Sequence, residues 1–146
     1  MTDNWTEAAT TTHQDHVIAH VIDTTVLGYL VLDDAIHLLL DIGFIWKIYV
    51  DGEMGLLPHP VAMAELNVEA ELLTQFKIDV DLLLKGNGEL GLARFVPIRD
   101  SFPITAVQPF VRGDEHKLLL EGETQIIQIT TSMKEASIEI TEGLRS

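Results

Sequence analysis

The sequence predicts a single strand-rich α+β domain, in which a predominantly antiparallel sheet, curved or a partial barrel, packs with one or two short helices. Hydrophobic residues make up 47% of the 146-residue chain, enough apolar mass for an independent core. Short apolar or alternating runs recur along the chain, and Gly, Asp and Pro separate them. The longest apolar run falls far short of the ~20 residues that a membrane-spanning helix needs.

The chain begins with a polar stretch. Residues 1–14 predict a flexible N-terminal segment, and residues 15–146 predict one globular domain. Trp5 is the apolar exception in this segment, and we expect it to dock on the body of the domain or on a partner subunit.

Two buried strands are predicted next, at residues 16–22 and 26–32. Both stretches are rich in β-branched and apolar side chains, and the polar residues 23–25 separate them. Because the apolar character is nearly continuous in each, we expect both strands to be buried on both faces.

A short helix is predicted over residues 34–42. Asp33-Asp34 precedes an apolar stretch, and an aspartate there accepts the free amide hydrogens of a first helical turn. The apolar residues that follow recur at helical spacing, and Gly43 suits the left-handed residue after a helix. The alternative is a hairpin that turns at Asp33-Asp34.

The clearest strand is FIWKIYV, residues 44–50. Asp51-Gly52 then predicts a tight turn, because glycine takes the positive φ of a type I′ turn, and residues 54–57 form the return strand. Pro58-His59-Pro60 ends that strand, since neither proline can donate to a ladder. The two prolines are expected to hold His59 in an extended stretch.

The middle of the chain is less clear. Residues 61–75 fit either a helix or a strand. Residues 76–82 alternate apolar with charged side chains and predict a half-buried strand, followed by a turn and a return strand at 90–98. Four more strands are predicted in the last third, at 104–111, 117–121, 124–131 and 136–141.

The charge is strongly negative. The chain carries 23 Asp and Glu against nine Lys and Arg, for a formal net charge of −14 at pH 7. Such a charge repels phosphate backbones and anionic membranes, so we expect neither nucleic acid nor membrane as a partner. The absence of cysteine excludes disulfides and thiolate chemistry. It also suits a reducing compartment, and we expect a cytoplasmic protein.

Three histidines are the candidate metal ligands: His13, His16 and His20. On a helix they would line one face, where neutral imidazoles three or four residues apart can share a divalent ion. On the strand predicted at 16–22, however, His16 and His20 lie about 13 Å apart, too far for one ion. We therefore expect no cofactor, with a divalent metal as the open alternative.

Three further residues are candidates for ligand binding. His37 and Asp41 stand four residues apart on the predicted helix, where they could share a hydrogen bond. His59 lies between two prolines, and such a rigid stretch can present a side chain to a ligand. No nucleophile accompanies any of the three in the sequence, so no catalytic residue is predicted.

The leading functional hypothesis is a non-enzymatic homodimeric module that binds a protein partner or a small ligand. A specific version is an antitoxin- or immunity-like inhibitor, whose negative surface steers it onto a basic toxin. The alternative is a metal-dependent hydrolase, or another small enzyme, whose histidines and carboxylates converge from distant segments. An apolar cavity lined by two or more histidines would favour the enzyme; a flat acidic surface would favour the interaction protein.

Overall fold

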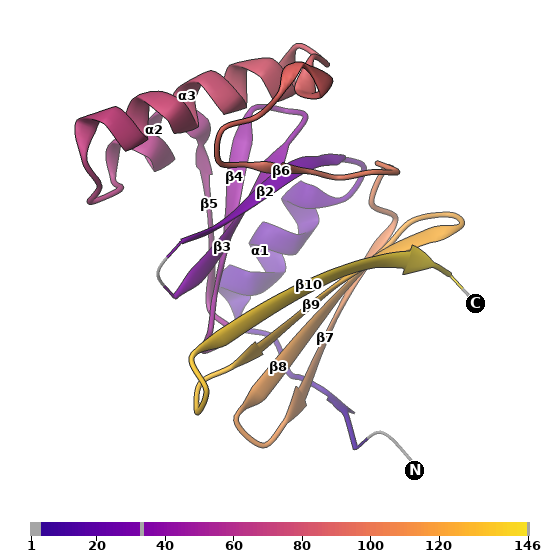
Figure 1. The fold of residues 1–146 in the computed structure, drawn as a ribbon. Helices are drawn as coiled ribbons and strands as arrows, with labels where there is room; N and C mark the ends of the chain where they lie inside the picture. Colours follow the sequence, from indigo (N-terminus) through magenta and orange to yellow (C-terminus); the bar gives the residue numbers. More distant parts are fainter. Residues whose placement is uncertain (1–3, 33, 146) are drawn as a thin grey trace.

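The computed structural model describes residues 4–32 and 34–145, and these residues form two open five-stranded antiparallel sheets and three α-helices (Figure 1). One sheet, the β2–β6 sheet, has the order β5-β4-β3-β2-β6 and contains β2 (Val26–Leu32), β3 (Ala35–Leu40), β4 (Phe44–Tyr49), β5 (Met54–Pro58) and β6 (Val96–Pro97). The other, the β7–β10 sheet, has the order β1-β7-β8-β9-β10 and contains β1 (Thr6–Glu7), β7 (Ala106–Arg112), β8 (Glu115–Glu121), β9 (Gln125–Ser132) and β10 (Ser137–Leu144). The helices are α1 (Thr12–Val21), α2 (His59–Ala64) and α3 (Ala70–Leu84), with a 3-10 turn at Gly88–Leu90. The predicted strand-rich α+β class is confirmed.

Two apolar cores lie on opposite faces of the β2–β6 sheet. One core fills the space between the two sheets and includes helix α1; the other lies under α2 and α3 (Figure 1). All six residues of β3 are buried. Successive side chains of a strand point to opposite faces of the sheet, so β3 contributes to both cores. Ile36 and Leu38 of β3 enter the first core, and Leu39 enters the second. The β2–β6 sheet is therefore the central layer of the molecule.

The strand predicted at 16–22 is wrong, because these residues belong to helix α1 and its C-terminal end. A capping box starts the helix. The Thr11 hydroxyl accepts a hydrogen bond from the backbone N–H of Gln14, and the Gln14 side-chain oxygen accepts one from the backbone N–H of Thr11. Val17 and Val21, one turn apart, are the buried pair. The capping box therefore outweighs the β-branched composition.

The helix predicted over 34–42 is also wrong, and the alternative hairpin is correct. Residues 35–40 form β3, which pairs antiparallel with β2. Of the predicted turn pair, Asp34 lies in the turn and Asp33 falls outside the described residues. All six residues of β3 are buried, and a continuous apolar run of this length does not distinguish a helix from a doubly buried strand.

The segment from 44 to 60 matches its prediction except at its end. Strands β4 and β5 pair as expected, and Gly52 between them has a φ of +86°. Pro58 ends β5, but His59 begins helix α2, so the extended stretch predicted for His59 is wrong. Proline fits the first turn of a helix because the amide that it lacks has no partner there.

The strands predicted at 76–82 and 90–98 are wrong as well. Residues 76–82 lie in α3, whose buried face holds Phe76, Asp79, Val80 and Leu83. That spacing is helical, so the alternation seen in the sequence was incidental. Residues 61–75 were expected to be either helix or strand, and the helix is correct: this range includes the end of α2 and the start of α3. Of residues 90–98, only Val96–Pro97 pairs in a sheet, and its partner is β2.

Asp79 explains why the chain after α3 runs as a loop. Asp79 is 1% exposed, and its carboxylate accepts hydrogen bonds from three consecutive backbone amides. The N–H groups of Ala93, Arg94 and Phe95 donate at 2.8, 2.6 and 2.8 Å. These bonds place Phe95 in the second core and lead the chain into β6.

The four predicted strands of the last third are confirmed as β7 to β10, which pair successively as antiparallel neighbours. Within the described residues, no helix is long and apolar enough to cross a membrane.

Residues 5–11 cross from β7 to helix α1, and we call them the N-terminal strap. Its strand β1 pairs with the C-terminal half of β7. The Trp5 ring docks on the body of the domain, with the Arg112 guanidinium 4.3 Å and the Lys117 ammonium 4.7 Å from its centroid. Residues 4–14 of the segment predicted to be flexible thus include β1 and the first turn of α1.

Replacing Trp5 with alanine is expected to loosen the strap. Each cation over an aromatic ring contributes about 0.5–1 kcal/mol at an exposed site, so losing both contacts should speed hydrogen exchange of the Ala8 amide about tenfold. That amide donates to the Pro109 carbonyl at 3.0 Å. Trp5→Phe keeps an aromatic ring and should show a smaller increase. An unchanged exchange rate in the alanine variant would show that Trp5 does not hold the strap.

Candidate functional site

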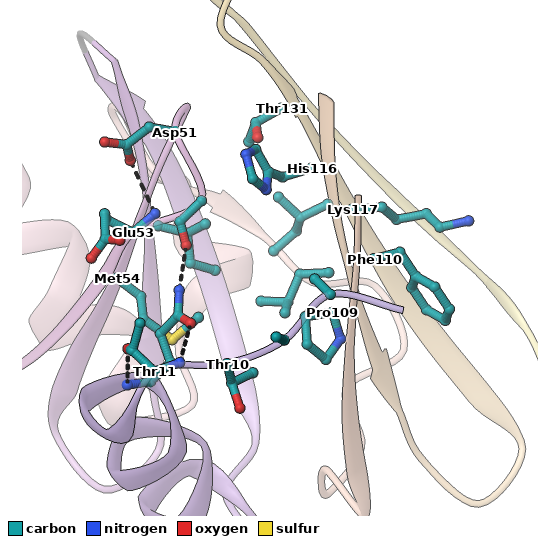
Figure 2. Close-up of a pocket in the computed structure, with 17 residues that line it drawn as sticks. Thr10, Thr11, Asp51, Glu53, Met54, Pro109, Phe110, His116, Lys117 and Thr131 are labelled. Atoms are coloured by element: carbon teal, nitrogen blue, oxygen red, sulfur yellow. Dashed lines mark hydrogen bonds between the residues drawn. The ribbon is translucent and has the colours of Figure 1, made fainter. Parts of the chain in front are cut away.

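A cavity of about 210 Å³ lies between the strap, the β4–β5 turn and the inner faces of β8 and β9 (Figure 2). Its apolar wall includes Ile48, Met54, Pro109, Leu118 and Ile129. Three larger hollows, of about 290, 310 and 430 Å³, occur elsewhere among the described residues. Within the described part of the chain, none of these three is lined by a buried polar side-chain atom that lacks a hydrogen-bond partner. The inter-sheet cavity is therefore the candidate site.

His116 and Thr131 form the polar wall of this cavity. They stand directly opposite each other on β8 and β9, and Figure 2 shows both side chains directed toward the β4–β5 turn. Thr131 is 2% exposed, and its Oγ1 has no hydrogen-bond partner. A buried hydroxyl left unpaired costs about 1–3 kcal/mol, so this atom calls for an explanation.

The alternation of β8 and the β4–β5 turn set the position of His116. On β8, His116 shares the inner face with Leu118 and Leu120, and Lys117 points to the opposite face. A Cβ on Gly52 would lie 2.7 Å from Nδ1 of His116, so the turn packs directly against the imidazole. Gly52 therefore allows both the turn and the close approach of the two sheets.

The neutral polar side chains on the strap side already have partners. Gln14 donates from Nε2 to the Gly52 carbonyl at 3.0 Å and accepts from the Thr11 amide at the same distance. The Thr10 hydroxyl donates to the Asp15 carboxylate. These bonds join the strap, α1 and the β4–β5 turn into one wall.

The charged residues of the lining direct their charges elsewhere. The Lys117 ammonium lies 5.0 Å from the Phe110 ring centroid on the outer face of the β7–β10 sheet. Asp51 accepts from the Glu53 amide at 3.0 Å. Figure 2 shows the carboxylates of Asp51 and Glu53 directed away from His116 and Thr131. The interior of the cavity is therefore polar at His116 and Thr131 without a built-in carboxylate or ammonium.

The predicted metal ligands His13, His16 and His20 do lie on a helix, but they do not form a ligand set. Nε2 of His13 lies 3.0 Å from the Met54 carbonyl oxygen, and Nδ1 of His20 lies 2.7 Å from the His16 carbonyl oxygen. Across the described residues, no group of three or more histidines and carboxylates could hold a metal ion.

The predicted binding residues are also separated. His37 is 2% exposed on β3, and Asp41 is exposed beyond the end of that strand, where it accepts from the Thr25 amide at 3.0 Å. The hydrogen bond predicted between His37 and Asp41 required both residues to lie on a helix, so this prediction is wrong. His59 starts α2 and is half-buried.

His37 has an unusual environment of its own. It lies on the α2 side of the β2–β6 sheet beside a small cavity of about 60 Å³. Burial, and after it the charge of the neighbouring Lys47, lowers the pKa of His37 from its ordinary 6.5 to about 4. The residue is therefore neutral at physiological pH.

His116 and Thr131 were not among the predicted site residues, although both line the cavity. A signal was present in both strands, because each places a polar residue beside buried apolar residues on the same face: His116 with Leu118, and Thr131 with Ile127 and Ile129. Such a residue is often only a core residue with a hydrogen bond, and the missing partner of Thr131 becomes visible only in the folded structure.

Comparisons of the chain with family models, with curated proteins and with solved structures found no match. The function is therefore inferred from the geometry of the site.

Proposed function

We propose that the protein is a non-enzymatic binding module that holds a small molecule in the cavity between its two sheets. The unpartnered hydroxyl of Thr131 carries the proposal, because a ligand group in the cavity would give it a hydrogen bond. Ligand sites are typically apolar with a few placed polar groups, which is the composition found here. At about 210 Å³ the cavity is below the ~300–1,000 Å³ of sites for drug-sized ligands, so the ligand is small.

The arrangement of the polar wall favours binding over catalysis. A hydroxyl nucleophile needs a base within hydrogen-bond reach and a third group that orients the base. Thr131 and His116 share no hydrogen bond, and within the described residues no carboxylate bonds to the His116 ring. His116 is also the single histidine in the lining, so the convergence that the enzyme alternative requires is not found there.

The inhibitor-like version of the function, in which negative charge steers the protein onto a basic partner, stays a prediction. The homodimer and the cytoplasmic location stay predictions as well.

Ligand binding can be tested by recording ¹H–¹⁵N NMR spectra with a library of small molecules. Compounds that bind in the cavity should shift the amide resonances of Gly52, His116 and Thr131 while those of α3 stay in place. A library without any such compound, or binders that act only on α3, would contradict the proposal.

Replacing Thr131 with valine is expected to raise the free energy of unfolding by about 1 kcal/mol when no ligand is present. Valine has nearly the same shape, and it removes the buried hydroxyl that lacks a partner. The melting temperature should rise by roughly 3 °C. Thr130→Val is the matched control, because Thr130 lies on the opposite face of the same strand. A clear loss of stability in Thr131→Val alone would show that the hydroxyl has a partner.

A further inference from the structure

We propose that the ligand is an uncharged molecule whose apolar body fills the cavity and whose hydroxyl or carbonyl group pairs with Thr131 and His116. This inference rests on the proposed function and adds the chemical class of the ligand. Three observations support it: the polar groups that are still available, the direction of the nearby charges, and the position of the available polar groups at one end of the cavity.

The available polar groups are those of His116 and Thr131. The Gln14 side chain is already bonded at both its oxygen and its nitrogen, and the Thr10 hydroxyl is bonded to a carboxylate. The Thr131 hydroxyl has no partner, and the His116 ring makes no hydrogen bond to the part of the chain that the structure describes. A hydroxyl and an imidazole can each donate and accept, so together they fit a ligand hydroxyl or carbonyl.

The charges around the cavity disfavour a charged ligand. A charged head group at Thr131 would lose its hydration, and an opposite charge would have to compensate for that loss. The Lys117 ammonium cannot do so for an anion, since it packs on aromatic rings of the outer face. The carboxylates of Asp51 and Glu53 point away from the polar wall, so they do not receive a cation there (Figure 2). The net charge of −14 opposes an anion further.

The polar groups that are still available lie together at one end of the cavity. His116 and Thr131 lie near the β4–β5 turn, and Pro109 lies by the strap at the other end (Figure 2). The apolar pair Leu118 and Ile129 lies on the same two strands, two residues from His116 and Thr131 respectively. A ligand with one polar group therefore has a defined orientation, with its apolar body toward the strap.

Four compounds built on one aromatic ring test this inference: toluene, benzyl alcohol, benzoate and benzylammonium. Each is titrated at neutral pH into the wild type, Thr131→Val and Thr130→Val, with dissociation constants taken from NMR shifts of the cavity amides. In the wild type, benzyl alcohol should bind about tenfold more tightly than toluene, the difference expected for one hydrogen bond, and more tightly than either ion. Thr131→Val should lose most of the preference for the alcohol over toluene, and Thr130→Val should keep it.

The other outcomes separate this inference from the proposed function. If benzoate or benzylammonium binds as tightly as the alcohol, the ligand is not uncharged, but the cavity still binds small molecules. If toluene binds as tightly as the alcohol, the polar pair does not select the ligand. If none of the four shifts the cavity amides, the ligand-binding function itself is contradicted for molecules of this size.

Discussion

Replacing Asp79 with alanine is expected to lower the free energy of unfolding by about 4 kcal/mol. Asp79 is 1% exposed, and its carboxylate accepts three backbone hydrogen bonds, from Ala93, Arg94 and Phe95. Hydrogen bonds to a charged group contribute about 1.5–3 kcal/mol each. The loss should be smaller than the full sum, because the exposed residues Ala93 and Arg94 can turn their amides to water, whereas the buried Phe95 cannot.

The effect should spread beyond the loop. Phe95 packs edge-on against Phe76 of α3, with ring centroids 6.2 Å apart, and the next residue enters β6. Losing the Asp79 bonds therefore weakens the second core and the edge of the β2–β6 sheet together.

Urea unfolding of Asp79→Ala and Asp81→Ala provides the measurement. Asp81 lies on the same helix, is exposed, and forms a 3.0 Å ion pair with Lys85. Its removal should cost less than about 0.5 kcal/mol. Asp79→Asn, which keeps one acceptor oxygen, should fall between the two. Equal stabilities of the two alanine variants would show that the three amide bonds do not hold the loop.

Acidification from pH 7 to pH 4 is expected to remove about 3 kcal/mol of stability through His37 alone. The folded-state pKa is about 4, and the ordinary value, which holds in the unfolded chain, is 6.5. Between these values the unfolded state binds a proton that the folded state does not, so stability rises with pH across this window. The contribution is complete above about pH 6.5 and is lost as the pH falls toward 4.

The variant His37→Gln isolates this contribution from that of the acidic side chains, which titrate nearby. Its free energy of unfolding, measured between pH 4 and pH 7, should vary less steeply than that of the wild type. His16→Gln, on an exposed position of α1, should keep the wild-type slope. Parallel profiles for wild type and His37→Gln would contradict a buried, neutral His37.

The predictability of each element depended on how local its signal was. Strands β7 to β10 were predicted because turn residues bound each one and each pairs with its neighbour along the chain. The C-terminal half of α3 was wrongly predicted as a strand, because the alternation of apolar and charged residues placed Asp79 on a solvent face. Its carboxylate is in fact buried against backbone amides 14 to 16 residues away, a tertiary contact that no periodicity reveals. For β3 a helix was preferred over the alternative hairpin, because a run buried on both faces has no periodicity that distinguishes a strand from a helix.

The candidate site was less predictable than the fold. Thr131 ends one predicted strand and His116 immediately precedes another, so alternation places both side chains on the apolar faces of these strands. The cavity that they line also needs the strap and the β4–β5 turn, and both belong to the first half of the chain. The histidines singled out in the sequence lie on α1, β3 and α2, and none of them lines this cavity.

The order of synthesis determines when the strap can form. The hydroxyl of Thr6 donates to the carbonyl of Val111, a residue 105 positions later in the chain. At about 5–20 residues per second, a ribosome completes that partner roughly 5–20 s after it has made Thr6. Strand β1 therefore cannot pair until β7 has been made, and the strap closes its side of the cavity only after that.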